Sequence, residues 1–124
     1  ANVDDSIKIT GQPNEFFQVV LVLIQNARES FKERNISNPQ IDFTVSQSNS
    51  TFLLEVTDNA GGISEQTRQH IFQPHFSTRE DGSGIGLYLA QLIIETSFNG
   101  DITHNNTANG SRFVLAIPLA SNVD

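Results

Sequence analysis

The sequence predicts an α+β fold: a two-layer α/β sandwich in which one mixed, mostly antiparallel sheet carries about three helices on one face. Apolar residues recur at three- and four-residue steps from Pro13 to about Arg34 and again from Ile85 to about Phe98, which is the period of a helix. Short alternating segments between turn residues indicate strands. Because helices and strands do not alternate strictly along the chain, the packing of layers favours one sheet with its helices on one face.

Composition limits the kind of protein. The chain has 124 residues, which fits a single domain over residues 1–124 with a modest core. The net charge is −7, and the 7 basic residues are scattered, so we expect no nucleic-acid partner. The absence of cysteine excludes disulfides and thiolate metal sites and favours a reducing compartment such as the cytoplasm. No apolar run reaches membrane-spanning length, so we expect no direct membrane contact.

The first part of the chain predicts a short strand followed by a long helix. Residues 6–10 alternate in the manner of a strand. The helix begins at Pro13, which a first helical turn tolerates, and Glu15 favours the positive end of the helix dipole. It runs to about Arg34. The apolar spacing predicts a core face that consists of Phe16, Val20, Leu23, Ala27 and Phe31, widened by Phe17, Leu21 and Ile24.

Two hairpins are predicted. Residues 41–45 and 51–57 alternate in the manner of strands and are joined around Asn49. Residues 101–104 and 112–117 make a second pair across a polar, glycine-containing turn.

The segment between the hairpins predicts a short helix, a loop and a second long helix. Ser64 can cap a helix that runs to about Phe72 and ends at Pro74. Residues 73–84 have no helical period and contain glycine, so we expect a mobile loop there. The second long helix follows this loop, and Asn99 with the glycine after it closes that helix as a C-cap.

Asp58 and two later glycine-containing segments are the first candidate site features. Asp58 follows a predicted strand, where its carboxylate can accept a hydrogen bond from an exocyclic amine; the alternative is a turn residue that bonds its own backbone. Gly62 lets the chain pass close to a base that Ile63 would cover. Further on, Gly82, Gly84 and Gly86 open a helix whose unpaired amides can meet phosphate oxygens. Neither the Rossmann spacing nor a Walker lysine is present.

Asn26 and the segment from Phe72 to Arg79 complete the candidates. Asn26 is a polar amide in an otherwise apolar helix segment, and its carbonyl oxygen suits Mg²⁺; the alternative is an ordinary exposed helix residue. Phe76 offers a ring that packs under the loop or against a base, Thr78 offers a hydroxyl, and Arg79 offers a cation to a terminal phosphate. Each of these residues alone is ordinary loop chemistry.

Together these features resemble the ATP-binding catalytic domain of sensor histidine kinases, in the GHKL or Bergerat-fold ATPase superfamily. The resemblance covers nearly the whole chain and implies a Bergerat fold with ATP and Mg²⁺ as cofactors. It implies that Asp58 reads the adenine amino group and that Asn26 and Arg79 are catalytic, with Asn26 also the metal ligand. The nucleotide-binding residues that it implies are Asn26, Asp58, Gly62, Ile63, Phe76, Thr78, Gly82, Ser83, Gly84, Ile85, Gly86 and Leu87.

The chain departs from the family pattern at several positions. Ala60 stands where the family usually has glycine. Val22 stands where many histidine kinases have a second asparagine and hydrolytic relatives such as gyrase have glutamate, so we expect poor intrinsic hydrolysis. The phosphoacceptor is expected elsewhere, because His70, His75 and His104 all lack the sequence context of a phosphorylated histidine.

The resemblance therefore implies one domain excised from a larger signalling protein. We expect it to bind ATP·Mg²⁺ and to donate the γ-phosphate to a histidine on the dimerisation/phosphoacceptor domain of the same parent protein, with a response regulator receiver domain downstream. The parent protein can be anchored in a membrane while this domain stays cytoplasmic. The alternatives are an ATP-driven clamp like gyrase or the Hsp90 chaperones, and a nucleotide-binding module that has lost transfer.

Overall fold

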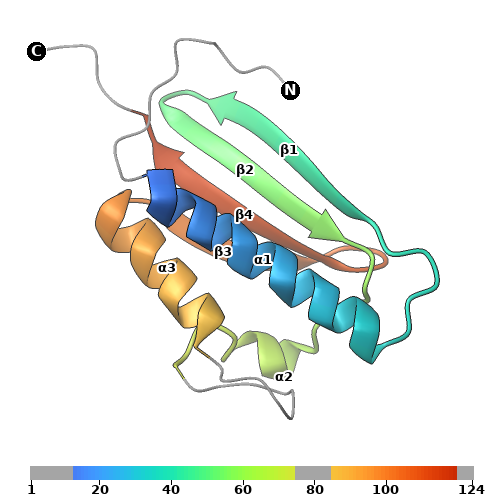
Figure 1. The fold of residues 1–124 in the computed structure, drawn as a ribbon. Coiled ribbons are helices and arrows are strands. Elements are labelled where there is room, and N and C mark those ends of the chain that lie inside the picture. The colour runs from blue at the N-terminus through green and yellow to red at the C-terminus, as the bar shows by residue number, and fades with distance from the viewer. Residues whose placement is uncertain (1–12, 75–84, 120–124) are drawn as a thin grey trace, which may run out of the picture.

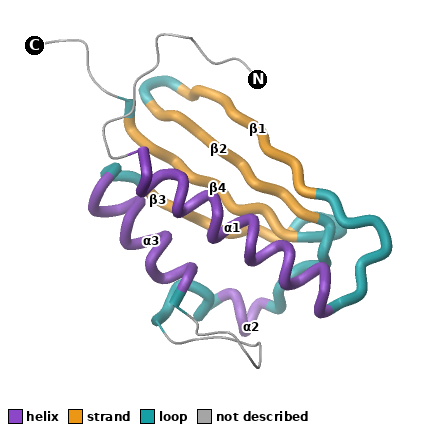
Figure 2. Tube along the Cα trace, viewed as in Figure 1, coloured by secondary structure: helices purple, strands orange, loops and turns teal. Residues whose placement is uncertain are grey.

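The computed structural model describes residues 13–74 and 85–119, which form two layers (Figure 1). One layer is a sheet with the strand order β1-β2-β4-β3, and all three pairings in it are antiparallel. The long helices α1 and α3 lie side by side on one face of this sheet (Figure 2). The elements are α1 (Pro13–Glu33), β1 (Ile41–Ser48), β2 (Thr51–Asp58), α2 (Glu65–Arg68), α3 (Gly86–Ser97), β3 (Asp101–Asn106) and β4 (Ser111–Pro118). The predicted α+β sandwich is confirmed; the strand expected at residues 6–10 lies outside the described residues.

The two long helices run antiparallel to each other. At one end, the Ser97 hydroxyl at the end of α3 donates to Glu15 Oε2 in the first turn of α1, at 3.1 Å. At the other end, a Cβ atom on Gly86, the first residue of α3, would lie 3.5 Å from Cγ1 of Val22. The N-terminus of α3 therefore lies beside the middle of α1.

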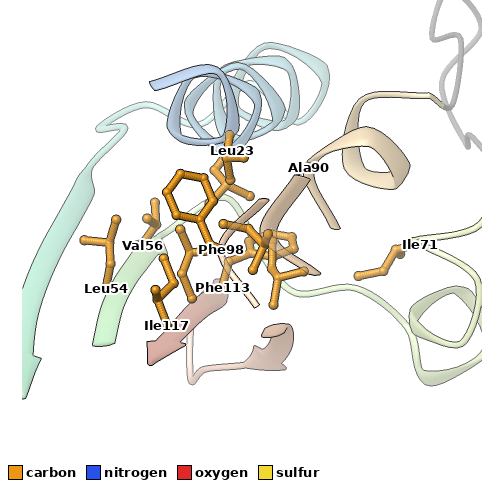
Figure 3. Packing of buried hydrophobic residues seen from close by; sticks show 12 residues of the cluster. Leu23, Leu54, Val56, Ile71, Ala90, Phe98, Phe113 and Ile117 are labelled. Atoms are coloured by element: carbon orange, nitrogen blue, oxygen red, sulfur yellow. The ribbon is translucent and has the colours of Figure 1, made fainter. Parts of the chain in front are cut away.

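The core lies between the helices and the sheet (Figure 3). Alternate residues of β4, namely Phe113, Leu115 and Ile117, are buried beneath the helices, as the two-residue period of a strand requires. The Phe72 ring, which follows α2, meets the Phe113 ring edge to face at a centroid distance of 6.3 Å. The segment after α2 is thereby attached to the same core.

The predicted core face of α1 is partly wrong. Leu23 and Ala27 are buried as expected, and Val19 completes their row. Phe17 and Leu21, however, are 64% and 62% exposed. On a helix of 3.6 residues per turn they project away from the buried row, so the apolar stripe is wider than the face that α1 buries.

The ends of α2 and α3 show how local hydrogen bonds set the boundaries. Ser64 caps α2 as predicted, since its hydroxyl accepts from the Thr67 amide at 3.2 Å. The helix ends at Arg68 and not at about Phe72, because the following amides turn to carbonyls three residues back, as in the 2.9 Å bond from the His70 amide to Thr67. At the end of α3, Asn99 adopts a φ of 55° and closes the helix in the left-handed conformation.

A buried histidine joins α2 to the sheet. His104 on β3 is 5% exposed and lies against the Phe113 ring, with centroids 4.9 Å apart. Arg68 donates through Nε to His104 Nδ1 at 3.2 Å and through Nη2 to the His104 carbonyl at 2.7 Å. Within the described residues no hydrogen bond reaches Nε2. Burial, and secondly the charge of Arg68, lower the pKa of His104 from 6.5 to about 4.

This histidine makes stability depend on pH. The unfolded chain takes up a proton at His104 near pH 6.5, whereas the folded protein resists protonation until about pH 4. The free energy of unfolding is therefore expected to fall as the pH is lowered through this interval, by up to about 3 kcal/mol from this residue. Urea denaturation between pH 7 and pH 4.5 measures it, and His104→Leu should reduce the slope. An identical slope in the variant would contradict the assignment.

Candidate functional site

Asp58 is the last residue of β2 and the centre of the candidate site. It is 7% exposed, and its Oδ1 accepts hydrogen bonds from the amides of Ala60 at 2.9 Å and Ser111 at 3.4 Å. Burial raises the pKa of Asp58, while these two amides and the charge of Arg34 oppose that rise. Both hydrogen bonds to this carboxylate within the described residues end on Oδ1. One carboxylate oxygen, Oδ1, therefore bonds the backbone of the turn, and Oδ2 is left for another donor.

The segment after Asp58 is held from one side by Arg34, which follows α1. Nη1 of Arg34 donates to the carbonyl of Ala60 at 2.9 Å and to that of Gly62 at 3.0 Å. Gly61 between them has a φ of 85°, and a Cβ atom there would collide with the same Nη1. Only glycine meets both requirements, the left-handed backbone and the close approach of the guanidinium.

From the other side the segment is held by the end of β3 and the turn after it. The Asn106 side chain accepts from the Ile63 amide at 2.8 Å and donates to the Ile63 carbonyl at 2.7 Å. The Gly61 amide donates to the Asn109 carbonyl at 3.0 Å. The structure explains why position 62 is a glycine, because a Cβ atom there would lie 2.8 Å from Asn106 Oδ1. The Ile63 side chain packs against the core.

The start of α3 is the second part of the candidate site. Ile85 occupies the N-cap position and provides no side-chain cap, and the first turn contains no acidic residue. The amides of such a turn and the positive end of the helix dipole suit an anion. Leu87 packs against the core and Gly86 lies beside Val22. The predicted residues Phe76, Thr78, Arg79, Gly82, Ser83 and Gly84 lie outside the described residues.

Asn26 lies on α1 between these two parts. It is partly buried and stands one turn after Val22, which contacts the start of α3, and two turns before Arg34. At 1.5 Å per residue these separations are about 6 Å and about 12 Å along the helix. The helix therefore lines up the start of α3, Asn26 and the segment that carries Asp58.

The described residues contain neither a cluster of metal-ligating side chains nor a membrane-spanning helix. In residues 13–74 and 85–119, no group of three or more His, Cys, Asp or Glu side chains could hold a metal ion. In the same ranges, no helix has both the length and the apolar character needed to cross a membrane.

Sequence reasoning missed Arg34, Asn106 and the role of Gly110. Gly110 brings its backbone so close to Asp58 and Asn59 that a Cβ atom would collide with both. Arg34 and Asn106 act on backbone groups 26 to 43 residues away, and no local spacing carries that signal. The signal in the sequence was the pair Gly61 and Gly62, where a Cβ atom would approach Arg34 Nη1 and Asn106 Oδ1 too closely.

Most of the chain matches a known family model. Residues 11–121 match the model described as histidine kinase-, DNA gyrase B- and HSP90-like ATPase. The two-component sensor PprA of Pseudomonas aeruginosa is 30% identical over 121 residues, which cover 91% of this chain and 13% of that protein. For sporulation kinase A of Bacillus subtilis the identity is 30%, covering 92% of this chain and 18% of the relative. The chain thus spans less than a fifth of the length of these two curated relatives.

Solved structures share the fold. The catalytic domain of histidine kinase ThkA, in a nucleotide-free form, superimposes with a TM-score of 0.78 at 29% identity, covering 93% of this chain and 73% of that one. The mycobacterial sensor histidine kinase MprB gives a TM-score of 0.78 at 20% identity, covering 91% and 78%. The likeness to MprB concerns the fold alone.

Proposed function

This chain belongs to the family of histidine kinase-, DNA gyrase B- and HSP90-like ATPases, and on that basis we propose that it binds ATP with Mg²⁺ and donates the γ-phosphate to a histidine on a separate domain. The observation that carries this proposal is the arrangement around Asp58. A carboxylate with one oxygen held by backbone amides lies at the end of β2. The start of α3, whose N-cap residue Ile85 provides no side-chain cap, lies beside Val22 of α1.

The base would be read by Asp58. Its Oδ2 would accept a hydrogen bond from the exocyclic amine of adenine, while Oδ1 stays bonded to the amides of Ala60 and Ser111. Gly62 and Ile63 would lie at the base, with their backbone already held by Arg34 and Asn106. Binding then need not order this segment, which removes one entropic cost of association.

The phosphates would lie toward α3. The segment Gly82-Ser83-Gly84-Ile85-Gly86-Leu87 would offer them backbone amides at the helix N-terminus. Phe76 would pack against the base, Thr78 would offer a hydroxyl, and Arg79 would offer its guanidinium to the terminal phosphate. Asn26 would supply a carbonyl oxygen to Mg²⁺, which when bound neutralises charge on the phosphates.

Val22 favours transfer over hydrolysis. It is partly buried, packs against the core and lies beside Gly86, so a valine methyl occupies the place beside the start of α3. A valine cannot accept a proton from water, and hydrolytic relatives would need a general base there. We therefore favour a kinase domain over an ATP-driven clamp. A binding module without transfer is the second candidate, since Val22 is compatible with it too.

The phosphoacceptor and the other partners would lie outside this domain. His104 is buried and bonded by Arg68, which leaves it unsuited to accept a phosphoryl group. We propose that residues 1–124 are one catalytic domain of a longer protein, whose dimerisation/phosphoacceptor domain supplies the histidine and whose downstream partner is a response regulator receiver domain. The relatives' greater length supports this proposal. We place the domain in the cytoplasm, whether or not the parent protein is membrane-anchored.

Replacing the proposed base reader tests the nucleotide site. Asp58→Asn keeps an Oδ1 acceptor for the two amides but removes the charge, so ATP and adenosine should each bind about 10- to 100-fold more weakly. Isothermal titration calorimetry measures both affinities. Asp42→Asn on β1 is the control, because it makes the same charge change at an exposed position. Equal affinities for the Asp58 variant and the wild type would remove Asp58 from the site.

Replacing the proposed magnesium ligand tests the chemistry. In the full-length parent protein, Asn26→Ala should lower the rate of histidine phosphorylation by at least tenfold while changing ATP affinity much less, because the metal stabilises charge that develops during transfer. Gln25→Ala, one residue earlier at an exposed position of the same helix, is the control. If Asn26→Ala phosphorylates at the wild-type rate across magnesium concentrations, Asn26 is only a helix residue.

A further inference from the structure

We propose that Arg34 is a positioning residue of the base site: by holding two backbone carbonyls after Asp58 it orients that segment and the carboxylate toward the base. This inference rests on the proposed function, but its structural half can be tested without a nucleotide. Arg34 stands just past the end of α1, where its own amide donates to the Ser30 carbonyl at 3.0 Å and the next residue, Asn35, turns the chain with a φ of 52°.

The contacts of Arg34 form one side of a clamp on two peptide groups. In the Ala60–Gly61 peptide, the carbonyl accepts from Arg34 Nη1 at 2.9 Å and the amide donates to the Asn109 carbonyl at 3.0 Å. In the Gly62–Ile63 peptide, the carbonyl accepts from the same Nη1 at 3.0 Å and the amide donates to Asn106 Oδ1 at 2.8 Å. Each peptide is thus bonded on both sides, and neither can rotate without losing a hydrogen bond to Arg34.

This clamp bears directly on Asp58. The Ala60 amide, which precedes the first clamped peptide, donates to Asp58 Oδ1 at 2.9 Å. If the carbonyl of Ala60 turned away from Arg34, the path of the chain through Ala60 would change and the carboxylate would lose its nearer amide. Nη1 gives both of its protons to these two carbonyls, so through this nitrogen Arg34 acts on the loop.

Arg34 also affects the charge of Asp58. Burial raises the pKa of Asp58, and the positive charge of Arg34 opposes that rise. Ser111 and Ala60 oppose it too, through their amides, but Arg34 is the charged side chain of the described residues that acts on this carboxylate. Removing the charge at position 34 should therefore make Asp58 easier to protonate.

The 124-residue chain with Arg34→Gln tests the inference. Arg28→Gln is the matched control, because it removes one positive charge from an exposed position on α1. Without nucleotide, amide hydrogen exchange at Gly61 and Ile63 should be at least tenfold faster in Arg34→Gln than in Arg28→Gln. With ligand, calorimetry should show ATP and adenosine weakened by the same factor, about tenfold, and tripolyphosphate binding unchanged.

The pH dependence separates positioning from a general loss of structure. Adenosine binding should weaken at low pH as Asp58 takes up a proton, and this acid limb should move to higher pH in Arg34→Gln. Arg34→Lys keeps the charge and should keep the acid limb of the wild type. It also provides the folded comparison if Arg34→Gln does not fold.

The outcomes are distinct. If amide hydrogen exchange at Gly61 and Ile63 is equally fast in Arg34→Gln and Arg28→Gln, Arg34 does not clamp the segment and the inference is overturned, whatever the nucleotide-binding results. A larger loss for ATP than for adenosine would also overturn it, since Arg34 would then act on phosphates. If the wild-type chain binds neither adenosine nor ATP, the proposed function fails, and the part of the inference that concerns the base fails with it.

Discussion

The close approach of the β3–β4 turn to the end of β2 is the constraint on which the candidate site depends. The backbone of Gly110 lies against the carbonyl of Asp58, at a separation that no side chain at position 110 would permit. This contact brings the Ser111 amide to the Asp58 carboxylate and the Asn109 carbonyl to the Gly61 amide. A hairpin late in the chain thereby shapes a segment that precedes it by about 50 residues.

The sheet and α1 together join this segment to the rest of the site. Antiparallel pairing of β2 with β4 puts Asp58 at the edge where β4 begins. Arg34, the residue after α1, bonds the segment that follows Asp58. The antiparallel packing of α1 on α3 puts the α3 N-terminus about 18 Å back along α1, at Val22. A ligand with a base at one end and phosphates at the other fits such a division, with Asn26 between them. The half proposed to bind the base is built from backbone that is hydrogen-bonded on both sides, so its shape belongs to the fold.

Local patterns predicted the elements better than the contacts between them. The helical period placed α1 correctly and the alternation of strands placed both hairpins, because both signals repeat within a few residues. The prediction that Phe17 and Leu21 are buried was wrong, since an apolar stripe does not reveal how much of it a neighbouring element covers. Asp58 and its glycines stood out as a motif. Arg34 and Asn106 did not, because each acts on a backbone group more than 25 residues away.

The central claim is that the base half of the site is preformed by the fold. Amide hydrogen exchange of the nucleotide-free chain tests it most directly at Ala60, Gly61 and Ile63, whose amides donate to Asp58, Asn109 and Asn106. A preformed segment predicts slow exchange at all three amides without nucleotide and little further slowing when ATP is added. Fast exchange without nucleotide, slowed at least tenfold by ATP, would show that the ligand orders the segment and would contradict the claim.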